Sequence, residues 1–287
     1  MKRTYFLAAT AILFWSSVAT VTKLLMGSMT SMQVLSVSSL FAFLFLLCTN
    51  AATGRLALLR TYRVRDYLIT VLVGLPGTFL YYMFYYAGAS RLPASQAFII
   101  NYLWPIMSVV FACVILKERM TLRKGIAILL SFFGVMVVMG GGLFGGGSFS
   151  PLGALFCALG AVSYGVYTAL NSKVSYDKAL SMMFYYGTAC LLSTLIALWQ
   201  GDLPSLTLPT VLGLAYNGVL TMAVANTAWL LALFSGKTAK VSNLAYITPF
   251  LSLVFTALFL REEITLWSIL GLLIIVSGIL IQLKDAK

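Results

Sequence analysis

The sequence predicts an all-α integral membrane protein in which ten transmembrane helices form two inverted repeats of five helices each. Three observations support this fold class: an apolar composition, ten long apolar runs and an internal repeat. Of the 287 residues, 61% are hydrophobic and 9% are charged, and the mean hydropathy is +0.99. A soluble domain carries about 25% charged residues. We therefore expect most of the surface of this chain to face lipid.

Ten apolar runs have the length of about 20 residues that is needed to cross a bilayer. They cover residues 4–24, 32–52, 67–87, 93–115, 123–142, 151–172, 179–199, 208–232, 241–260 and 265–283. The first run follows Met1-Lys2-Arg3 and could pass for a signal peptide. Because its apolar stretch is too long and no small-x-small cleavage site closes it, we interpret it as the first spanning helix.

The basic residues follow the topology of these spans. The net charge of +12 could suggest a nucleic-acid partner. When the helices are numbered from a cytoplasmic N-terminus, however, sixteen Lys and Arg residues fall inside and two, Arg91 and Arg261, fall outside. This split obeys the positive-inside rule. We therefore expect a multi-pass protein of the bacterial inner (plasma) membrane, with both termini in the cytoplasm and no nucleic-acid partner.

Lys23 is left out of that count because it lies at the end of the first apolar run. Its side chain could snorkel to the outer interface. Alternatively, it could face a cavity and meet a substrate carboxylate, or cap a neighbouring helix. Both readings stay open from the sequence.

The chain repeats itself at an offset of 144 residues. The offset aligns Tyr102 with Tyr246, Pro105 with Pro249, Ser108 with Ser252, Glu118 with Glu262, Thr121-Leu122 with Thr265-Leu266, and Gly134 with Gly278. The predicted repeats are residues 1–145 and 146–287, joined by the glycine-rich run Gly140 to Ser148. Because each repeat holds five helices, an odd number, the second must enter the membrane inverted. Inverted repeats are typical of secondary transporters, although a duplicated scaffold or channel is the alternative.

The sequence gives no sign of an enzyme or a metal site. It contains no His, and its four cysteines all lie in apolar spans without paired spacing, so we expect no catalytic residue, bound metal or cofactor. The seven acidic residues fall at span ends or in loops. A proton- or cation-coupled pump usually holds an ionisable group in the membrane interior. We therefore expect facilitated diffusion or exchange.

Two prolines lie near the middle of their spans, Pro105 in the fourth and Pro249 in the ninth. Each lacks an N–H, so the carbonyls of Asn101 and Ala245 lose their helical partners. Inside a bilayer, such irregular backbone is tolerated against protein or a water-filled cavity. A single membrane proline could be a tolerated kink. The matched pair instead predicts two helix kinks that serve as gating points beside a midplane pathway.

Polar and aromatic side chains share helical faces with these kinks. Asn101, Trp104 and Ser108 follow a spacing of three and four residues, which places them on one face. The same spacing links Tyr164, Thr168 and Asn171, and also Thr78, Tyr81 or Tyr82, and Tyr85. The predicted substrate-binding residues are Trp15, Tyr82, Tyr85, Asn101, Trp104, Tyr164, Asn226 and Tyr246. For Tyr85, Tyr86, Tyr185 and Tyr186, which lie nearer span ends, the competing interpretation is an interfacial aromatic belt.

Several stretches are similar to the EamA-type members of the drug/metabolite transporter superfamily. They are "ILFWSSVATVTK", "RLPASQAFIINYLWPIMSVVFACVILKERMTLRKGIAILLSFFGVMVV" and "KVSNLAYITPFLSLVFTALFLREEITLWSILGLLIIVSGILI". The resemblance implies a ten-helix basket with a central cavity surrounded by helices 1, 3, 4, 6, 8 and 9, and with helices 5 and 10 outside it. The run Asn-Tyr-Leu-Trp-Pro resembles the bacterial branch that exports aromatic and other amino acids.

These observations give one expected function and, besides the scaffold or channel named above, one alternative transport function. We expect a secondary transporter that exports amino acids, aromatic and other neutral ones, or similar small metabolites by alternating access. The alternative is a multidrug exporter of hydrophobic cations with the same fold. The expected partners are the small-molecule substrate and the lipid bilayer, and the protein is expected to act as a monomer or a homodimer.

Overall fold

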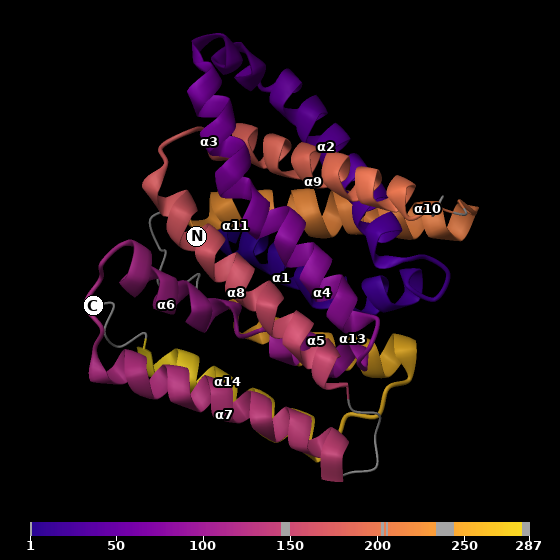
Figure 1. Ribbon diagram of the computed structural model, residues 1–287, viewed down its shortest axis with the longest axis vertical. Coiled ribbons are helices and arrows are strands. Elements are labelled where there is room, and N and C mark those ends of the chain that lie inside the picture. Colours follow the sequence, from indigo (N-terminus) through magenta and orange to yellow (C-terminus); the bar gives the residue numbers. More distant parts are fainter. Residues whose placement is uncertain (1, 145–149, 202–203, 205, 234–243, 283–287) are drawn as a thin grey trace.

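The computed structural model describes residues 2–144, 150–201, 204, 206–233 and 244–282, and in these residues it contains helices and no strand (Figure 1). The first repeat contains α1 (Lys2–Leu25), α2 (Ser31–Ala52), η1 (Arg55–Thr61), α3 (Val64–Leu75), η2 (Pro76–Leu80), α4 (Tyr81–Ala89), α5 (Ala94–Asn101), α6 (Trp104–Ile115) and α7 (Leu122–Phe144). The second contains α8 (Pro151–Lys173), α9 (Lys178–Trp199), α10 (Leu208–Ala215), η3 (Tyr216–Val224), α11 (Ala225–Leu233), α13 (Ile247–Leu260) and α14 (Leu266–Gln282).

The helices confirm an all-α membrane fold. Eight stretches of the described residues are long and apolar enough to cross a bilayer, and two shorter apolar helices, Ile247–Leu260 and Leu266–Ile281, follow them. The predicted ninth run, 241–260, is described only from Leu244 onward. The predicted boundary between the repeats, at residues 145 and 146, lies outside the described residues. Helix α7 continues to Phe144, so part of the predicted glycine-rich linker is helical.

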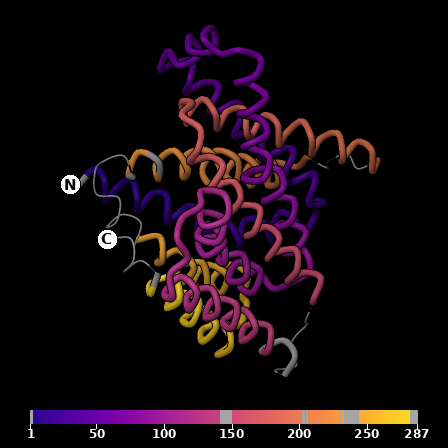
Figure 2. Tube along the Cα trace, turned by 60° about the vertical axis from the view of Figure 1, so that its left-hand side comes forward, coloured from indigo at the N-terminus to yellow at the C-terminus, as the bar shows by residue number. Residues whose placement is uncertain are grey.

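The last helices of the two repeats, α7 and α14, pack against each other along one side of the molecule (Figures 1 and 2). Glycines allow the two backbones to meet. A Cβ atom added to Gly134 would lie 2.7 Å from the Gly271 carbonyl oxygen, and one added to Gly271 would lie 2.6 Å from that of Gly134. Small residues at such contacts favour helix association in membranes, where van der Waals packing contributes much of the attraction.

Both predicted kinks lie beside interruptions of the helical backbone. Between α5 and α6, Tyr102 and Leu103 form a turn, and another turn at Ala245 and Tyr246 precedes α13. The Ala245 carbonyl, which Pro249 deprives of its helical donor, accepts hydrogen bonds from the Tyr102 hydroxyl at 2.8 Å and the Thr248 N–H at 3.0 Å. A tyrosine in the break of the first repeat therefore satisfies the carbonyl freed in the second.

Each repeat also has a π-helical segment in its third spanning helix, which the sequence did not predict. In the first repeat η2 (Pro76–Leu80) joins α3 to α4, and in the second η3 (Tyr216–Val224) joins α10 to α11. Pro76 opens η2 and cannot donate a backbone hydrogen bond. A π-helical turn adds a residue to the helix and changes which side chains share a face beyond it; such turns are frequent at functional sites.

The glycine contact between α7 and α14 gives a stability prediction. Gly271→Ala should destabilise the protein by about 1–3 kcal/mol, because its new Cβ would overlap the Val138 side chain as well as the Gly134 carbonyl oxygen. Thermal unfolding in detergent measures the effect. The matched control is Gly125→Ala on α7, where an added Cβ meets no atom within 4 Å. Equal midpoints for Gly271→Ala and the wild type would contradict the close approach.

Candidate substrate site

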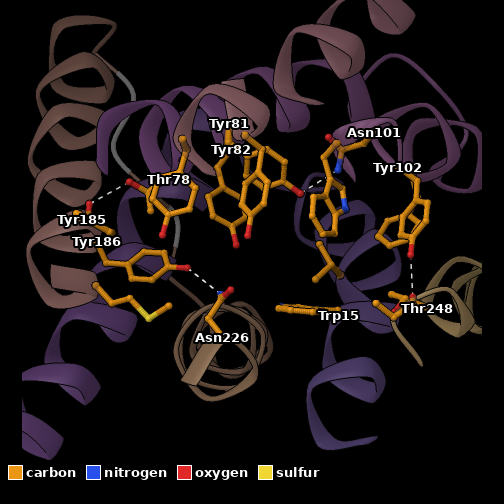
Figure 3. Close-up of a pocket in the computed structure, with 18 residues that line it drawn as sticks. Trp15, Thr78, Tyr81, Tyr82, Asn101, Tyr102, Tyr185, Tyr186, Asn226 and Thr248 are labelled. Carbon is orange, nitrogen blue, oxygen red and sulfur yellow. Dashed lines mark hydrogen bonds between the residues drawn. The ribbon is translucent and has the colours of Figure 1, made fainter. Parts of the chain in front are cut away.

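A central pocket lies between the interrupted helices of both repeats (Figure 3). Its volume is about 80 Å³. Most of the lining side chains are aromatic or carry an amide or a hydroxyl. The lining residues are Trp15, Val18, Gly77, Thr78, Tyr81, Tyr82, Phe98, Asn101, Tyr102, Trp104, Tyr164, Tyr167, Met182, Tyr185, Tyr186, Asn226, Ala245 and Thr248.

Six of the eight predicted substrate-binding residues line this pocket: Trp15, Tyr82, Asn101, Trp104, Tyr164 and Asn226. The other two do not. Tyr85 is fully buried and packs its ring against those of Tyr81 and Tyr86. Tyr246 lies in the turn before α13, where its neighbours Ala245 and Thr248 contribute to the lining instead. The predicted kink residues Pro105 and Pro249 do not line the pocket; they follow the two breaks in the sequence.

The aromatic walls are contributed by different helices that hold one another in place. The Trp104 ring lies edge-on to Tyr164, with ring centroids 5.1 Å apart, and Tyr164 is also 5.1 Å from Tyr81. Across the pocket, Trp15 of α1 lies 5.3 Å from Trp229 of α11. Offset and edge-to-face ring pairs of this kind contribute about 0.5–1.5 kcal/mol each beyond their buried area. The walls are therefore positioned before a ligand arrives.

The two amides of the pocket are held by phenols. The Asn101 Nδ2 donates to the Tyr81 hydroxyl at 2.9 Å. The Asn226 Nδ2 donates to the Met222 carbonyl at 2.6 Å and to the Tyr186 hydroxyl at 3.2 Å, as Figure 3 shows for the bond to Tyr186. These bonds fix the side chains on opposite sides of the pocket, where they can hydrogen-bond the polar part of a ligand.

Sequence reasoning missed several lining tyrosines. The sequence favours an interfacial belt for Tyr185 and Tyr186, but both are buried and line the pocket. The signal available in the sequence was their distance from the start of the span, since α9 begins at Lys178 and two helical turns separate the tyrosines from that end. Tyr167, also missed, lies one turn beyond Tyr164 on α8 and shares its face.

A wider vestibule continues the pocket toward the end of the molecule where α8 ends and α9 begins. Its volume is about 320 Å³, and it shares Tyr164, Tyr167, Met182, Tyr185 and Asn226 with the central pocket. Farther out it is lined by Thr168, Asn171, Ser172, Val174 and Lys178, with Trp229 at one side. Lys178 is the one charged residue among the lining residues of the two cavities in the described part of the chain.

At the end away from the vestibule, Lys23 and Glu262 form a charged clamp around the corner between α4 and α5. The Lys23 ammonium donates to the carbonyls of Ala89 at 2.9 Å and Leu92 at 2.6 Å. The Glu262 carboxylate accepts from the backbone N–H groups of Ala94 at 2.6 Å and Ser95 at 3.0 Å. A cation at the end of α4 and an anion at the start of α5 both match the helix dipoles. Lys23 therefore caps a neighbouring helix, one of the alternatives left open by the sequence.

A buried polar network lies between this clamp and the pocket. Asn217, fully buried in η3, donates to Ser38 of α2 at 3.0 Å and to the Tyr86 hydroxyl at 2.8 Å. Its own side-chain oxygen accepts from Thr221 at 2.8 Å. With its amide used in this way, Asn217 joins three spanning helices. It does not line the pocket, whereas Asn226, nine residues later, does.

Comparison with known proteins agrees with this architecture. The sequence model of the EamA-like transporter family matches the chain twice, over residues 2–140 and 151–283. The uncharacterized transporter YvbV of Bacillus subtilis is 28% identical over 227 residues, which cover 77% of this chain and 72% of that protein. The aromatic amino acid exporter YddG of Salmonella typhimurium is 27% identical over 190 residues, or 62% of each chain.

A solved crystal structure of another protein has the same fold. It matches with a TM-score of 0.67 and 22% identity, and the match covers 98% of this chain and 96% of that one. The two family matches together span both repeats and nearly the whole chain. The protein therefore belongs to the EamA-like transporter family, as a multi-pass membrane transporter rather than an enzyme.

Proposed function

We propose that this transporter exports aromatic and other neutral amino acids, or similar small metabolites, across the bacterial inner membrane by alternating access. The observation that carries the proposal is the uncharged pocket of rings and amides at the point where the helices of both repeats are interrupted. The similarity to a protein named as an aromatic amino acid exporter supports the same substrate class.

The pocket offers both parts of a neutral amino acid a partner. The indoles of Trp15 and Trp104 and the phenol of Tyr82 present ring surfaces to an apolar side chain and to an ammonium group, for which a cation–π contact contributes about 0.5–2 kcal/mol. The amides of Asn101 and Asn226 can hydrogen-bond the polar head. A hydrophobic drug cation would gain the ring contacts but would find no carboxylate among the described lining residues. This difference favours amino acids over the multidrug alternative.

The open and closed ends fit one state of an alternating-access cycle. The positive-inside distribution of Lys and Arg would place the vestibule, beside Lys173 and Lys178, at the cytoplasmic end. The clamp of Lys23 and Glu262 would then lie at the outer end. Substrate entering from the cytoplasm would reach the central pocket while the outer end is closed. Because the described spans carry no carboxylate in their interior, the driving force is the solute gradient, used in facilitated diffusion or exchange.

The substrate pocket is tested by Trp104→Ala. We expect at least a tenfold loss of counterflow of a radiolabelled aromatic amino acid in proteoliposomes, because about 1.4 kcal/mol of lost ring contact corresponds to that factor. Trp199→Ala is the matched control, since Trp199 is 87% exposed and does not line the pocket. Competition by hydrophobic cations without competition by amino acids would support the multidrug alternative and contradict the proposal.

The clamp is tested by Glu262→Gln in a variant whose four native cysteines are replaced and Ser95 is changed to Cys. Ser95 is 4% exposed beside the clamp, so we expect slow reaction with a membrane-impermeant maleimide when Glu262 is present. Removing the charge weakens two charge-assisted hydrogen bonds, and labelling should become at least about fivefold faster.

Glu263→Gln provides the control for this experiment, because the neighbouring Glu263 is exposed and, among the described residues, forms no hydrogen bond or ion pair with α5. The labelling rate of this variant should equal that of the Ser95→Cys protein in which both glutamates are retained. Equal rates for Glu262→Gln and Glu263→Gln would show that the carboxylate of Glu262 does not hold the end closed.

A further inference from the structure

We infer that the vestibule contains a carboxylate-binding site formed by Lys178 and Asn171, which receives the carboxylate of the substrate at the mouth of the transport path. The inference rests on the proposed function. It identifies the carboxylate as the end of the amino acid that stays nearest the mouth while the remainder points inward. Neither residue is needed to explain the central pocket, because neither lines it.

Lys178 supplies the charge. It is the first residue of α9, lines the vestibule and is partly buried. Its ammonium donates to the carbonyls of Asn171 and Val174, both at 2.7 Å, and to Asn171 Oδ1 at 3.2 Å. These bonds anchor the lysine at the C-terminal end of α8, but their acceptors are uncharged. Partial charges at a helix end amount to about half an elementary charge, so they leave the site positive.

Lys178 has no carboxylate partner within the described residues. The adjacent Asp177 is already used: one oxygen caps α9 by accepting from the Leu180 N–H at 2.8 Å, and the other lies 3.6 Å from the Arg55 Nε. The remaining charge of Lys178 therefore points to an anion supplied by the ligand. A cavity with low-dielectric walls concentrates such a field and raises the local concentration of oppositely charged solutes.

Asn171 supplies directed donors. Its Oδ1 accepts two hydrogen bonds, from the Lys178 ammonium and from the Tyr185 hydroxyl, each at 3.2 Å. Both bonds require the oxygen at that position, which fixes the orientation of the amide. Its NH2 group then points away from both partners, and no acceptor for it is found in the described part of the chain. The three N–H groups of the Lys178 ammonium are already used, so Lys178 attracts a carboxylate by its charge, and the two free N–H donors of Asn171 supply the hydrogen bonds.

The position of the site orients the substrate. Tyr185 contacts Asn171 through its hydroxyl and also lines the central pocket, so the two cavities adjoin at this side chain. A carboxylate held by Lys178 and Asn171 would direct the remainder of the molecule inward, along the rings of Tyr164 and Tyr167. The site therefore selects solutes that combine a carboxylate with an apolar or aromatic part. An amine or amide of the same shape lacks the group that the site binds.

Asn171→Asp is the discriminating variant. The aspartate keeps an oxygen for both Lys178 and Tyr185 and adds an ion pair, so the local fold is retained. It also removes the N–H donors and neutralises the lysine. Lys178→Gln is the second variant. Lys173→Gln is the matched control, because Lys173 is exposed at the end of α8 and does not line the vestibule.

Two readouts separate this site from the proposed function. The first is counterflow of phenylalanine, competed with unlabelled phenylalanine or phenylalaninamide, in proteoliposomes. The second is the shift in thermal unfolding of the purified protein with 3-phenylpropionate or phenethylamine. For the wild type we expect phenylalanine to compete better than phenylalaninamide, and 3-phenylpropionate to stabilise the protein more than phenethylamine. For Asn171→Asp and Lys178→Gln we expect at least about a tenfold weaker interaction with phenylalanine and 3-phenylpropionate. The interaction with phenylalaninamide and phenethylamine should not weaken.

The carboxylate site would be overturned if the variants weakened the binding of the carboxylates and of their amide or amine analogues equally, or weakened neither. This holds even when counterflow is intact. A wild type that is stabilised by 3-phenylpropionate in a manner dependent on Asn171 and Lys178, yet shows no amino-acid counterflow, would retain the site and reject the proposed function. If Lys173→Gln weakened the interaction with the carboxylates as much as Lys178→Gln does, the effect would be one of general surface charge. That result would overturn the inference.

Discussion

A backbone carbonyl inside a bilayer must find a hydrogen-bond donor, and two mid-span prolines remove one donor each from this protein. The response of the fold is visible at Ala245, whose carbonyl is bonded by the Tyr102 hydroxyl from the opposite repeat. That bond ties the two interrupted helices together at the centre of the molecule. The central pocket lies beside these breaks, where irregular backbone is sheltered from lipid and lined by protein.

The two repeats contain equivalent residues but place them in different surroundings. Glu262 binds the N-terminal end of α5, whereas Glu118, its equivalent in the first repeat, is 50% exposed and pairs with Lys124 at 3.0 Å. Such a difference between matched residues fits the alternating-access cycle that we propose, in which one end of the path would be closed while the other is open. In the proposed cycle, Lys23 and Glu262 would hold the outer end closed by their bonds to helix termini, and the vestibule of Lys178 would be the open end.

Much of this architecture could be predicted from the sequence because the bilayer restricts what a chain can do. Length and apolar composition predicted the spans, and the cost of an amide in lipid placed Asn101 and Trp104 toward the interior. The misplaced residues have physical causes. Tyr85 shares a helical face with Thr78 only in a regular helix, and the π-helical segment η2 (Pro76–Leu80) changes that register. Tyr185 and Tyr186 resembled an interfacial belt because composition does not reveal where a neighbouring helix covers a tyrosine.

We propose that an uncharged pocket moves amino acids down their own gradient by alternating access. The most direct measurement is counterflow of a radiolabelled aromatic amino acid into proteoliposomes preloaded with the unlabelled compound, before and after the membrane potential and pH gradient are collapsed. Counterflow that persists unchanged is the result predicted by a pocket without a carboxylate. Transport abolished by an uncoupler would contradict the claim, because it would require a titratable coupling group in the path.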